Sequence, residues 1–213
     1  MSFFQEYKTL VEPLLGRTLT PADSCAVRSA LQIPTALADY YAAVGAIDVI
    51  NRPHNRLLEP SELRVEDGMV VFYEENQCVA FWAIREGDLH LPDPTVYQGL
   101  DTTAGLEWHS EDMTVSRWFP VMIYWQIVNG GFPFVGYAAA IEDAERAVSA
   151  HYPFLIAHAN GSTRYYGTAS QIVCLAPSGA MVSVWAAGRT EKDFRHLARL
   201  LAFEWDYSTL EEL

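Results

Sequence analysis

The sequence predicts an α+β fold: a single domain with a mainly antiparallel or mixed central sheet flanked by helices. Three observations predict this class. Helical periodicity dominates the first 45 residues, a β-hairpin pattern lies between residues 70 and 84, and four short strand-like segments occupy much of the last third. The 213 residues contain neither a linker rich in Gly, Pro or Ser nor an internal repeat, so we expect residues 1–213 to form one domain.

The N-terminal region predicts three helices. Apolar residues recur at steps of three and four over residues 3–15, which is the spacing of an amphipathic helix, and Gly16 ends it. Thr20-Pro21-Ala22-Asp23 supplies an N-cap residue, a proline at the first helical position and an acid in the first turn, so a second helix is expected over residues 20–31. The third helix is expected over residues 34–45.

A polar break, Glu74-Glu75-Asn76-Gln77, separates two apolar runs at residues 70–73 and 78–84, and this pattern predicts a β-hairpin. Both runs are apolar at odd and even positions alike. Such strands are usually covered on both faces, so we expect the hairpin in the middle of the sheet. Glu74 and Glu75 are adjacent on one strand and point to opposite faces, which argues against a catalytic pair and predicts a solvated hairpin tip.

The middle of the chain predicts a long loop followed by two helices. Residues 86–112 contain several clusters of loop-forming residues, and loops of this length usually carry function or cover a core face. A helix is expected over residues 116–128, but Pro120 lies inside the pattern, so this helix either starts late or kinks there. A shorter helix is expected over residues 138–149, with acids near its N-terminus.

The last third predicts strands and one terminal helix. Thr190 and Asp193 have capping-box spacing, and the apolar residues Phe194, Leu197, Leu200 and Leu201 are expected to face inward from the helix that follows. The strands are expected at residues 154–158, 164–167, 171–175 and 181–185, with a turn at residues 176–179 between the last two.

Composition limits the classes of function. The chain has 27 acidic and 14 basic residues, a net charge of −13, which argues against sequence-independent nucleic-acid binding because that requires Lys and Arg at the phosphates. An acidic balance favours solubility, or attraction to a basic partner. No apolar stretch approaches the roughly 20 residues of a membrane span, and the N-terminus does not resemble a secretion signal, so a cytoplasmic protein with no membrane partner is expected.

The sequence predicts no metal or other cofactor. The three cysteines are far apart and embedded in apolar segments, which is typical of buried thiols in a reducing compartment. None of the six histidines lies at metal-ligand spacing from another. His109 is the best candidate for chemistry, because it is next to Trp108 and close in sequence to Glu107 and Glu111. Trp108 itself is expected to be half exposed in the 86–112 loop, where it would pin the loop or anchor a partner.

Four short motifs follow one another along the first 130 residues. In chain order they are Ile33-Pro34-Thr35-Ala36-Leu37-Ala38-Asp39-Tyr40-Tyr41, the segment from Glu75 to Trp82, Asp93-Pro94-Thr95-Val96, and Trp108 ahead of the helix expected from residue 116. This ordered set resembles the SUKH superfamily, which includes the yeast cell-wall-synthesis regulator domain, and the resemblance covers about residues 20–130. Two features depart from the family pattern: Cys78 stands where many members have glycine, and Asn-Gly-Gly does not follow Gly45.

The resemblance implies a non-enzymatic binding module with a protein partner. Many bacterial members are immunity proteins that neutralise toxin domains, including nucleases, and nucleases are often basic around their phosphate-binding sites. We therefore expect an immunity-type protein, with a basic toxin domain as its first candidate partner. A regulatory adaptor for a housekeeping protein and a hydrolase with a site near His109 are the alternatives. The expected partner surface comprises Glu74, Glu75, Asp93, Glu107, Trp108, Glu111 and Asp112.

Overall fold

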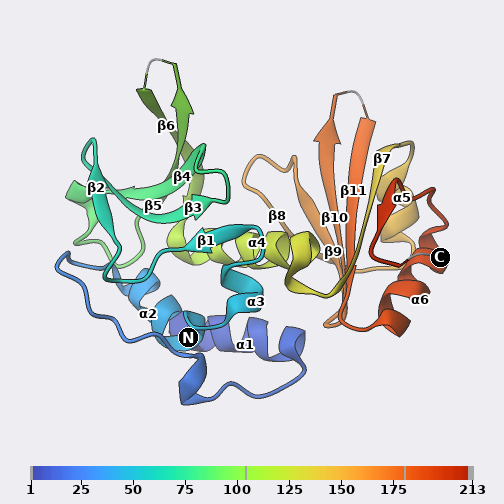
Figure 1. Ribbon diagram of the computed structural model, residues 1–213, viewed down its shortest axis with the longest axis horizontal. Coiled ribbons are helices and arrows are strands. Elements are labelled where there is room, and N and C mark those ends of the chain that lie inside the picture. The colour runs from blue at the N-terminus through green and yellow to red at the C-terminus, as the bar shows by residue number, and fades with distance from the viewer. Residues whose placement is uncertain (1, 104, 180, 211–213) are drawn as a thin grey trace.

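The computed structural model describes residues 2–103, 105–179 and 181–210 and has an α+β fold, as the sequence predicts (Figure 1). Its helices are α1 (Phe3–Leu15), α2 (Thr35–Val44), α3 (Asp48–Asn51), α4 (Val115–Gln126), α5 (Ala144–Ser149) and α6 (Glu191–Leu201). Its strands are β1 (Asn55–Leu57), β2 (Arg64–Glu66), β3 (Met69–Glu75), β4 (Ala80–Arg85), β5 (Thr95–Thr102), β6 (Gly105–Thr114), β7 (Phe134–Ile141), β8 (Phe154–Ala157), β9 (Arg164–Gly167), β10 (Gln171–Ser178), β11 (Met181–Gly188) and β12 (Tyr207–Ser208).

The described strands form two sheets, where the sequence predicts one central sheet. The first sheet has the order β1-β3-β4-β5-β6, with β2 also paired to β3, and the second has the order β12-β7-β11-β10-β9-β8. All pairings are antiparallel. The sheets stand side by side with α4 between them, α1 to α3 lie beside the first sheet, and α5 and α6 lie against the second (Figure 1). The chain before α4 therefore builds one sheet, and the chain after it builds the other.

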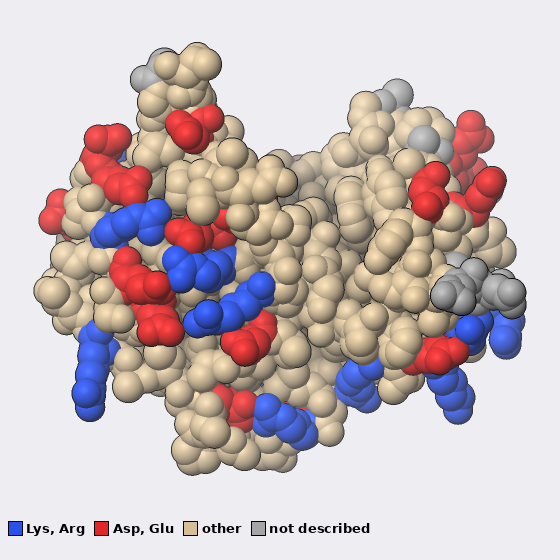
Figure 2. Space-filling model, viewed as in Figure 1, with Lys and Arg blue, Asp and Glu red and all other residues tan. Residues whose placement is uncertain are grey.

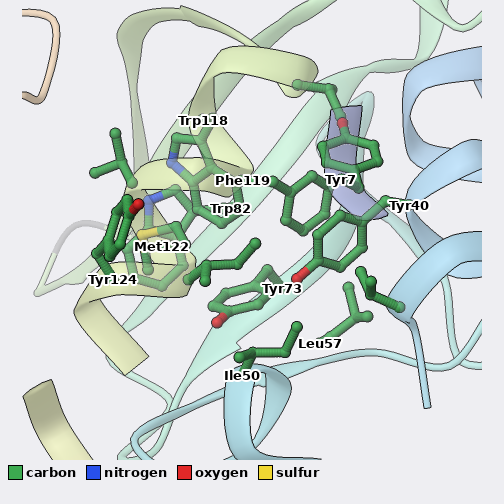
Figure 3. Close-up of a cluster of buried hydrophobic side chains, with 14 of the residues drawn as sticks. Tyr7, Tyr40, Ile50, Leu57, Tyr73, Trp82, Trp118, Phe119, Met122 and Tyr124 are labelled. Atoms are coloured by element: carbon green, nitrogen blue, oxygen red, sulfur yellow. The ribbon is translucent and has the colours of Figure 1, made fainter. Parts of the chain in front are cut away.

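An aromatic core fills the space between the first sheet and the helices. Phe119 of α4 is fully buried and stacks on Tyr40 of α2, with ring centroids 3.5 Å apart (Figure 3). Trp118 packs edge-on against Tyr73 of β3. The same core cluster continues into the second sheet, where Tyr165 stacks on a tyrosine of α4. Because α4 is buried against both sheets, it joins them through one continuous hydrophobic core.

The predicted hairpin is confirmed as β3 and β4, and it lies in the middle of the first sheet. Residues 69–73 are all buried, as expected for a strand covered on both faces. Val70 contributes to the main core, whereas Val71 packs in a smaller cluster on the opposite face with Leu58 and Trp108. The register shift between Val71 and Tyr73 turns Tyr73 back toward the main core.

The second predicted helix, over residues 20–31, is wrong. Only a 3-10 turn at Pro21–Asp23 forms, and residues 24–34 then have no regular secondary structure. The carboxylate of Asp23 binds the Arg17 guanidinium through two hydrogen bonds of 2.6 and 2.8 Å. The Cys25 N–H then donates to the Tyr41 carbonyl at the end of α2. Val27 is 41% exposed, so the apolar stripe expected on this helix has no core to enter.

The long loop predicted over residues 86–112 is also wrong. Apart from a 3-10 turn at Glu86–Asp88, most of this stretch belongs to β5 and β6, which pair with each other at the edge of the first sheet. Many of their side chains are polar because parts of both strands are exposed to solvent. The polar residues that resemble loop signals in the sequence are therefore the solvent-exposed residues of a sheet edge.

The helix predicted over residues 138–149 is wrong in its first half. Residues up to Ile141 belong to β7, and only Ala144–Ser149 is helical. Ala138 pairs with Val184 of β11 and is fully buried. Strand pairing with β11 on one side and β12 on the other overrides the helix propensity of the alanines.

The remaining predicted elements are confirmed, with small changes. Helix α4 begins at Val115, before Pro120, so the late start is wrong. The terminal helix begins at the predicted capping box of Thr190 and Asp193, but Leu200 is 37% exposed instead of inward-facing. Strands form at all four sites predicted in the last third, as β8 to β11. The turn predicted at residues 176–179 is wrong in position, because β10 continues through Ser178 and pairs with β11 up to that residue. None of the helices in the described part of the chain combines the length and hydrophobicity needed to span a bilayer.

The cysteines differ in their surroundings. Cys174 is buried in β10, and burial raises the pKa of its thiol to about 12. Cys25 is half-buried, and Cys78 is exposed in the turn between β3 and β4 with a φ of 58°. The expectation of a buried thiol is therefore wrong for Cys78. All three thiols are free.

Candidate functional site

A cleft of about 460 Å³ lies between the two sheets. Its lining combines the inner face of the first sheet, one side of α4, and the β8–β9 loop, residues 158–163. The outline of the molecule is notched between the sheets, and charged side chains in this view gather over the first sheet and near α5 and α6 (Figure 2). The residues lining the cleft include two carboxylates, two histidines and three tryptophans, and no Lys or Arg. Among the pockets formed by the described residues, this is the one whose lining combines polar and aromatic residues from both sheets. We therefore take it as the candidate site.

At one end of the cleft, a hydrogen-bonded network joins the two sheets. The Trp82 indole N–H donates to Glu111 Oε1 at 2.6 Å, and His158 Nε2 lies 2.6 Å from Glu111 Oε2. Trp82 is on the central strand β4, Glu111 is on β6, and His158 follows β8. Glu111 lies at a bulge in β6 where Asp112 has a φ of 54°. We call the part of the cleft formed by Trp82, Glu111 and His158 its closed end. These three residues link the first sheet to the β8–β9 loop.

The electrostatics of the closed end favour a charged pair. The hydrogen bond to Glu111 raises the pKa of His158, and burial opposes that rise. Only 22% of the His158 side chain and 11% of the Glu111 side chain are exposed, so water screens the pair weakly. Both carboxylate oxygens of Glu111 already have a partner, whereas His158 Nδ1 is buried and has no hydrogen-bond partner in the described part of the chain.

The other end of the cleft, its open end, is formed by Glu75, Asn55, His54 and Trp125. Asn55 and Glu75 are paired across β1 and β3, so their side chains share a face. The His54 ring packs edge-on against Trp125 at 5.8 Å between centroids. Burial lowers the pKa of His54, and Glu75 raises it by a smaller amount. His54 is therefore neutral at neutral pH, and the negative charge of Glu75 is not balanced by it.

Gln126 of α4 holds the open end in place. Its Oε1 accepts hydrogen bonds from the backbone N–H groups of His54, at 2.8 Å, and Asn55, at 3.1 Å. Its Nε2 donates to the Asn55 carbonyl and to the Tyr73 hydroxyl, each at 2.6 Å. Gln126 is fully buried, so these bonds fix the start of β1 against α4.

Asn55 is a buried side chain with an unused acceptor. It is only 2% exposed, yet its Oδ1 has no hydrogen-bond partner in the described part of the chain. Leaving a buried acceptor unpaired costs about 1–3 kcal/mol. Such groups are rare in native proteins, and an ordered water or another bound donor would satisfy this one.

Of the predicted partner-binding residues, the cleft brings together only Glu75 and Glu111. Glu74 lies on the opposite face of the first sheet, where Arg56 at 2.7 Å and Arg64 at 3.4 Å bind its carboxylate. Its side chain is 12% exposed, so the predicted solvated tip is wrong for Glu74. The two adjacent glutamates do point to opposite faces, as strand geometry predicts.

The other predicted residues lie outside the cleft. Asp93 accepts hydrogen bonds from the Ser116 N–H, at 2.9 Å, and hydroxyl, at 2.6 Å, and so caps the start of α4. Trp108 is half-buried on the opposite face of the first sheet, on a strand instead of a loop, with its indole ring over Gly99. Glu107 and Asp112 are exposed on β6.

The predicted hydrolase site does not assemble around His109. This residue is exposed on β6, and no group of three His, Cys, Asp or Glu residues suited to a metal ion occurs among the described residues. Within the cleft, the Ser162 hydroxyl donates to Asn160 Oδ1 instead of to a histidine. The described lining of the cleft therefore offers hydrogen-bond acceptors and aromatic rings, and the Ser162 hydroxyl is bonded to an amide oxygen.

The sequence did not single out His54, Asn55, Trp125 or His158. Each lies in or beside a helix or strand whose sequence pattern gives no signal of a functional site. These residues meet only because the two sheets pack around α4. Comparisons with known proteins found no matching family model, no matching curated protein and no matching solved structure. The function must therefore be argued from the cleft and from the order of the motifs.

Proposed function

We propose that this chain is a protein-binding module of the immunity type, which neutralises a basic toxin domain by direct contact in the cytoplasm. The observation that carries the proposal is the cleft between the sheets, whose lining contains Glu75 and Glu111 but no Lys or Arg. Such a site favours a positively charged group and disfavours phosphate. The resemblance to the SUKH superfamily supplies the class of partner.

The net charge of −13 supports the same proposal. Several arginines are already bound to acids of the same chain, including Arg17, Arg56 and Arg64. They offer little free positive charge to a partner. A protein with this balance attracts a basic partner over several ångströms, and the attraction raises the rate of association more than it lowers the rate of dissociation.

The contacts of Asp93 and Pro94 give the Asp-Pro motif a scaffold role that suits a binding module. Asp93 caps α4 through Ser116, and the Pro94 carbonyl accepts the Val115 N–H. These bonds fix the start of α4 against β5, and α4 forms one wall of the cleft. A binding site built on such rigid elements loses little conformational entropy when the partner arrives.

The test is binding of the purified chain to the toxin domain encoded by the neighbouring gene. We expect a stoichiometric complex by calorimetry, loss of toxin activity in the complex, and weaker binding as salt rises. Glu75→Lys should weaken the complex strongly, whereas Glu142→Lys, an equal charge change on an exposed residue outside the cleft, should have a small effect.

Absence of binding to any neighbouring toxin would contradict the proposal. A gene neighbourhood without toxins, together with a pull-down that recovers a housekeeping enzyme, would replace it with the adaptor function. Turnover of a substrate by the isolated chain would replace both with an enzymatic function.

A further inference from the structure

We infer that the open end of the cleft binds an arginine side chain of the protein partner, between Glu75, Asn55 and the ring of Trp125. This inference rests on the proposed protein-binding function and names the group of the partner that the cleft recognises. An arginine guanidinium is a planar cation with five N–H donors and no acceptor. The open end offers the complementary set of acceptors, negative charge and an aromatic face.

The open end of the cleft carries a negative charge that no cation of the described chain balances. Glu75 Oε2 accepts the backbone N–H of Gln77 at 2.7 Å, and Glu75 is in no ion pair within the described chain. His54 beside it is neutral at neutral pH, because burial lowers the pKa of its ring. Glu75 therefore presents an uncompensated carboxylate to the cleft, and a cation can pair with it.

The open end of the cleft also contains the unused acceptor of Asn55. Its side chain is 2% exposed and lines the cleft, and it lies on the same face of the sheet as its cross-strand partner Glu75. A donor from a ligand would satisfy its Oδ1. One guanidinium can donate to a carboxylate and to an amide oxygen at the same time, because its donors point in several directions in one plane. A lysine ammonium is a point charge and lacks this planar fork.

The ring of Trp125 forms an aromatic wall at the open end of the cleft. Trp125 is half-buried, whereas Trp82 is 7% and Trp118 is 1% exposed, so Trp125 is the most accessible of the three tryptophans that line the cleft. Its ring also contacts the rings of His54 and Trp185, each at 5.8 Å between centroids. A guanidinium stacked on an indole face gains about 0.5–2 kcal/mol. The closed end competes poorly for the same cation, because Trp82 and His158 already occupy both oxygens of Glu111.

The size of the cleft is compatible with one side chain and its flanking backbone. Small-molecule sites commonly have volumes of roughly 300–1,000 Å³, and this cleft has about 460 Å³. The partner's arginine would enter from the notch between the sheets, so its backbone would remain outside and contact the first sheet and the β8–β9 loop.

The experiment uses the ¹⁵N-labelled full chain and two probes, N-acetyl-arginine amide and N-acetyl-citrulline amide. Citrulline is nearly isosteric with arginine but neutral. The six tryptophans give six indole N–H signals that are well separated from the backbone region. We expect the arginine probe to shift the Trp125 signal saturably, with an affinity of about millimolar, and the citrulline probe to shift it little.

Two variants with the same change in charge provide the control. Glu75→Gln should weaken the arginine probe at least about tenfold, because a charge-assisted hydrogen bond is lost. The new amide can still accept the Gln77 N–H, so the fold should be retained. Glu107→Gln, exposed on β6 and outside the cleft, should change the affinity less than about twofold.

Equal affinity for the two probes, equal losses in the two variants, or arginine-induced shifts confined to tryptophans outside the cleft would overturn the inference. The outcome is separable from that of the proposed function. If the toxin domain binds but the arginine probe does not, this inference fails and the proposed function stands. If the probe binds as expected and no neighbouring toxin does, the cleft recognises arginine from another protein.

Discussion

Replacing Gln126 by leucine tests whether one buried amide holds the open end of the cleft. Gln126 makes four hydrogen bonds, to His54, Asn55 and Tyr73, with lengths between 2.6 and 3.1 Å, and is fully buried. Leucine has a similar volume and removes all four bonds without creating a large cavity. The backbone groups of His54 and Asn55 and the Tyr73 hydroxyl would then lack their partner.

The expected loss follows from the number of bonds. Each buried polar group that is left unpaired costs about 1–3 kcal/mol, so Gln126→Leu should lower the free energy of unfolding by at least about 4 kcal/mol. This is a large share of the 5–15 kcal/mol that stabilises a typical domain. For a chain of about this size, each kcal/mol shifts the melting temperature by about 2–4 °C, so the midpoint should fall by about 8–16 °C.

The assay is urea unfolding at neutral pH, followed by tryptophan fluorescence and by circular dichroism. Gln98→Leu is the matched control, because Gln98 also lines the cleft but is half-buried and has no side-chain hydrogen bond in the described part of the chain. It should change the free energy of unfolding by less than about 0.5 kcal/mol. Equal effects of the two substitutions would refute the role of Gln126 as the anchor of this end.

Three further outcomes are expected. The hydrogen bond to Glu111 raises the pKa of His158 in the folded state. The stabilisation from this pair should therefore be fully present below the unfolded pKa of about 6.5. It should fall as the pH rises through the folded pKa. The difference in unfolding free energy between the wild type and Glu111→Gln, measured from about pH 5 to 9, should therefore shrink as pH rises, and a constant difference would contradict this. Gly99→Ala would place a Cβ 2.7 Å from the indole ring of Trp108, so it should destabilise the protein by about 1–3 kcal/mol and alter the near-ultraviolet circular dichroism. Phe119→Ala should cost about 3–5 kcal/mol in denaturant unfolding because its ring is fully buried; a loss below about 1 kcal/mol would show that this part of the core repacks freely.

The elements that sequence reasoning predicted correctly are those with strong local signals. Helix α1 has a regular apolar stripe and ends at Gly16, and α6 begins with a capping box. The hairpin of β3 and β4 has a polar turn between two apolar runs. Each of these patterns is contained in fewer than about 16 residues, which is why no tertiary information was needed.

The errors occurred where pairing partners far along the chain decide the structure. β7 pairs with β11 and β12, and the alanines around Ala138 became strand residues for that reason. The sequence of β5 and β6 resembles that of a loop because many of their residues are polar and exposed to solvent. The segment after Asp23 has a helix start signal, but its carboxylate binds Arg17 and the helix does not continue.

The cleft could be predicted only in part. Glu75 and Glu111 were among the expected binding residues, although on the basis of sequence position and charge alone. Asn55 and His158 are separated by about 100 residues and face one cleft only because α4 places the two sheets side by side. No pattern within one segment contains that information, so the composition of the cleft had to come from the structure.

The continuity of the core through α4 has a consequence for truncation and for domain boundaries. Tyr124 of α4 stacks on Tyr165 of the second sheet, while Phe119, on the same helix, stacks on Tyr40 beside the first. A fragment that ends after α4, or one that begins with β7, would expose one apolar side of this helix or of its sheet to water. We therefore expect the two halves to melt in a single cooperative transition, and neither half to persist as an independent fragment.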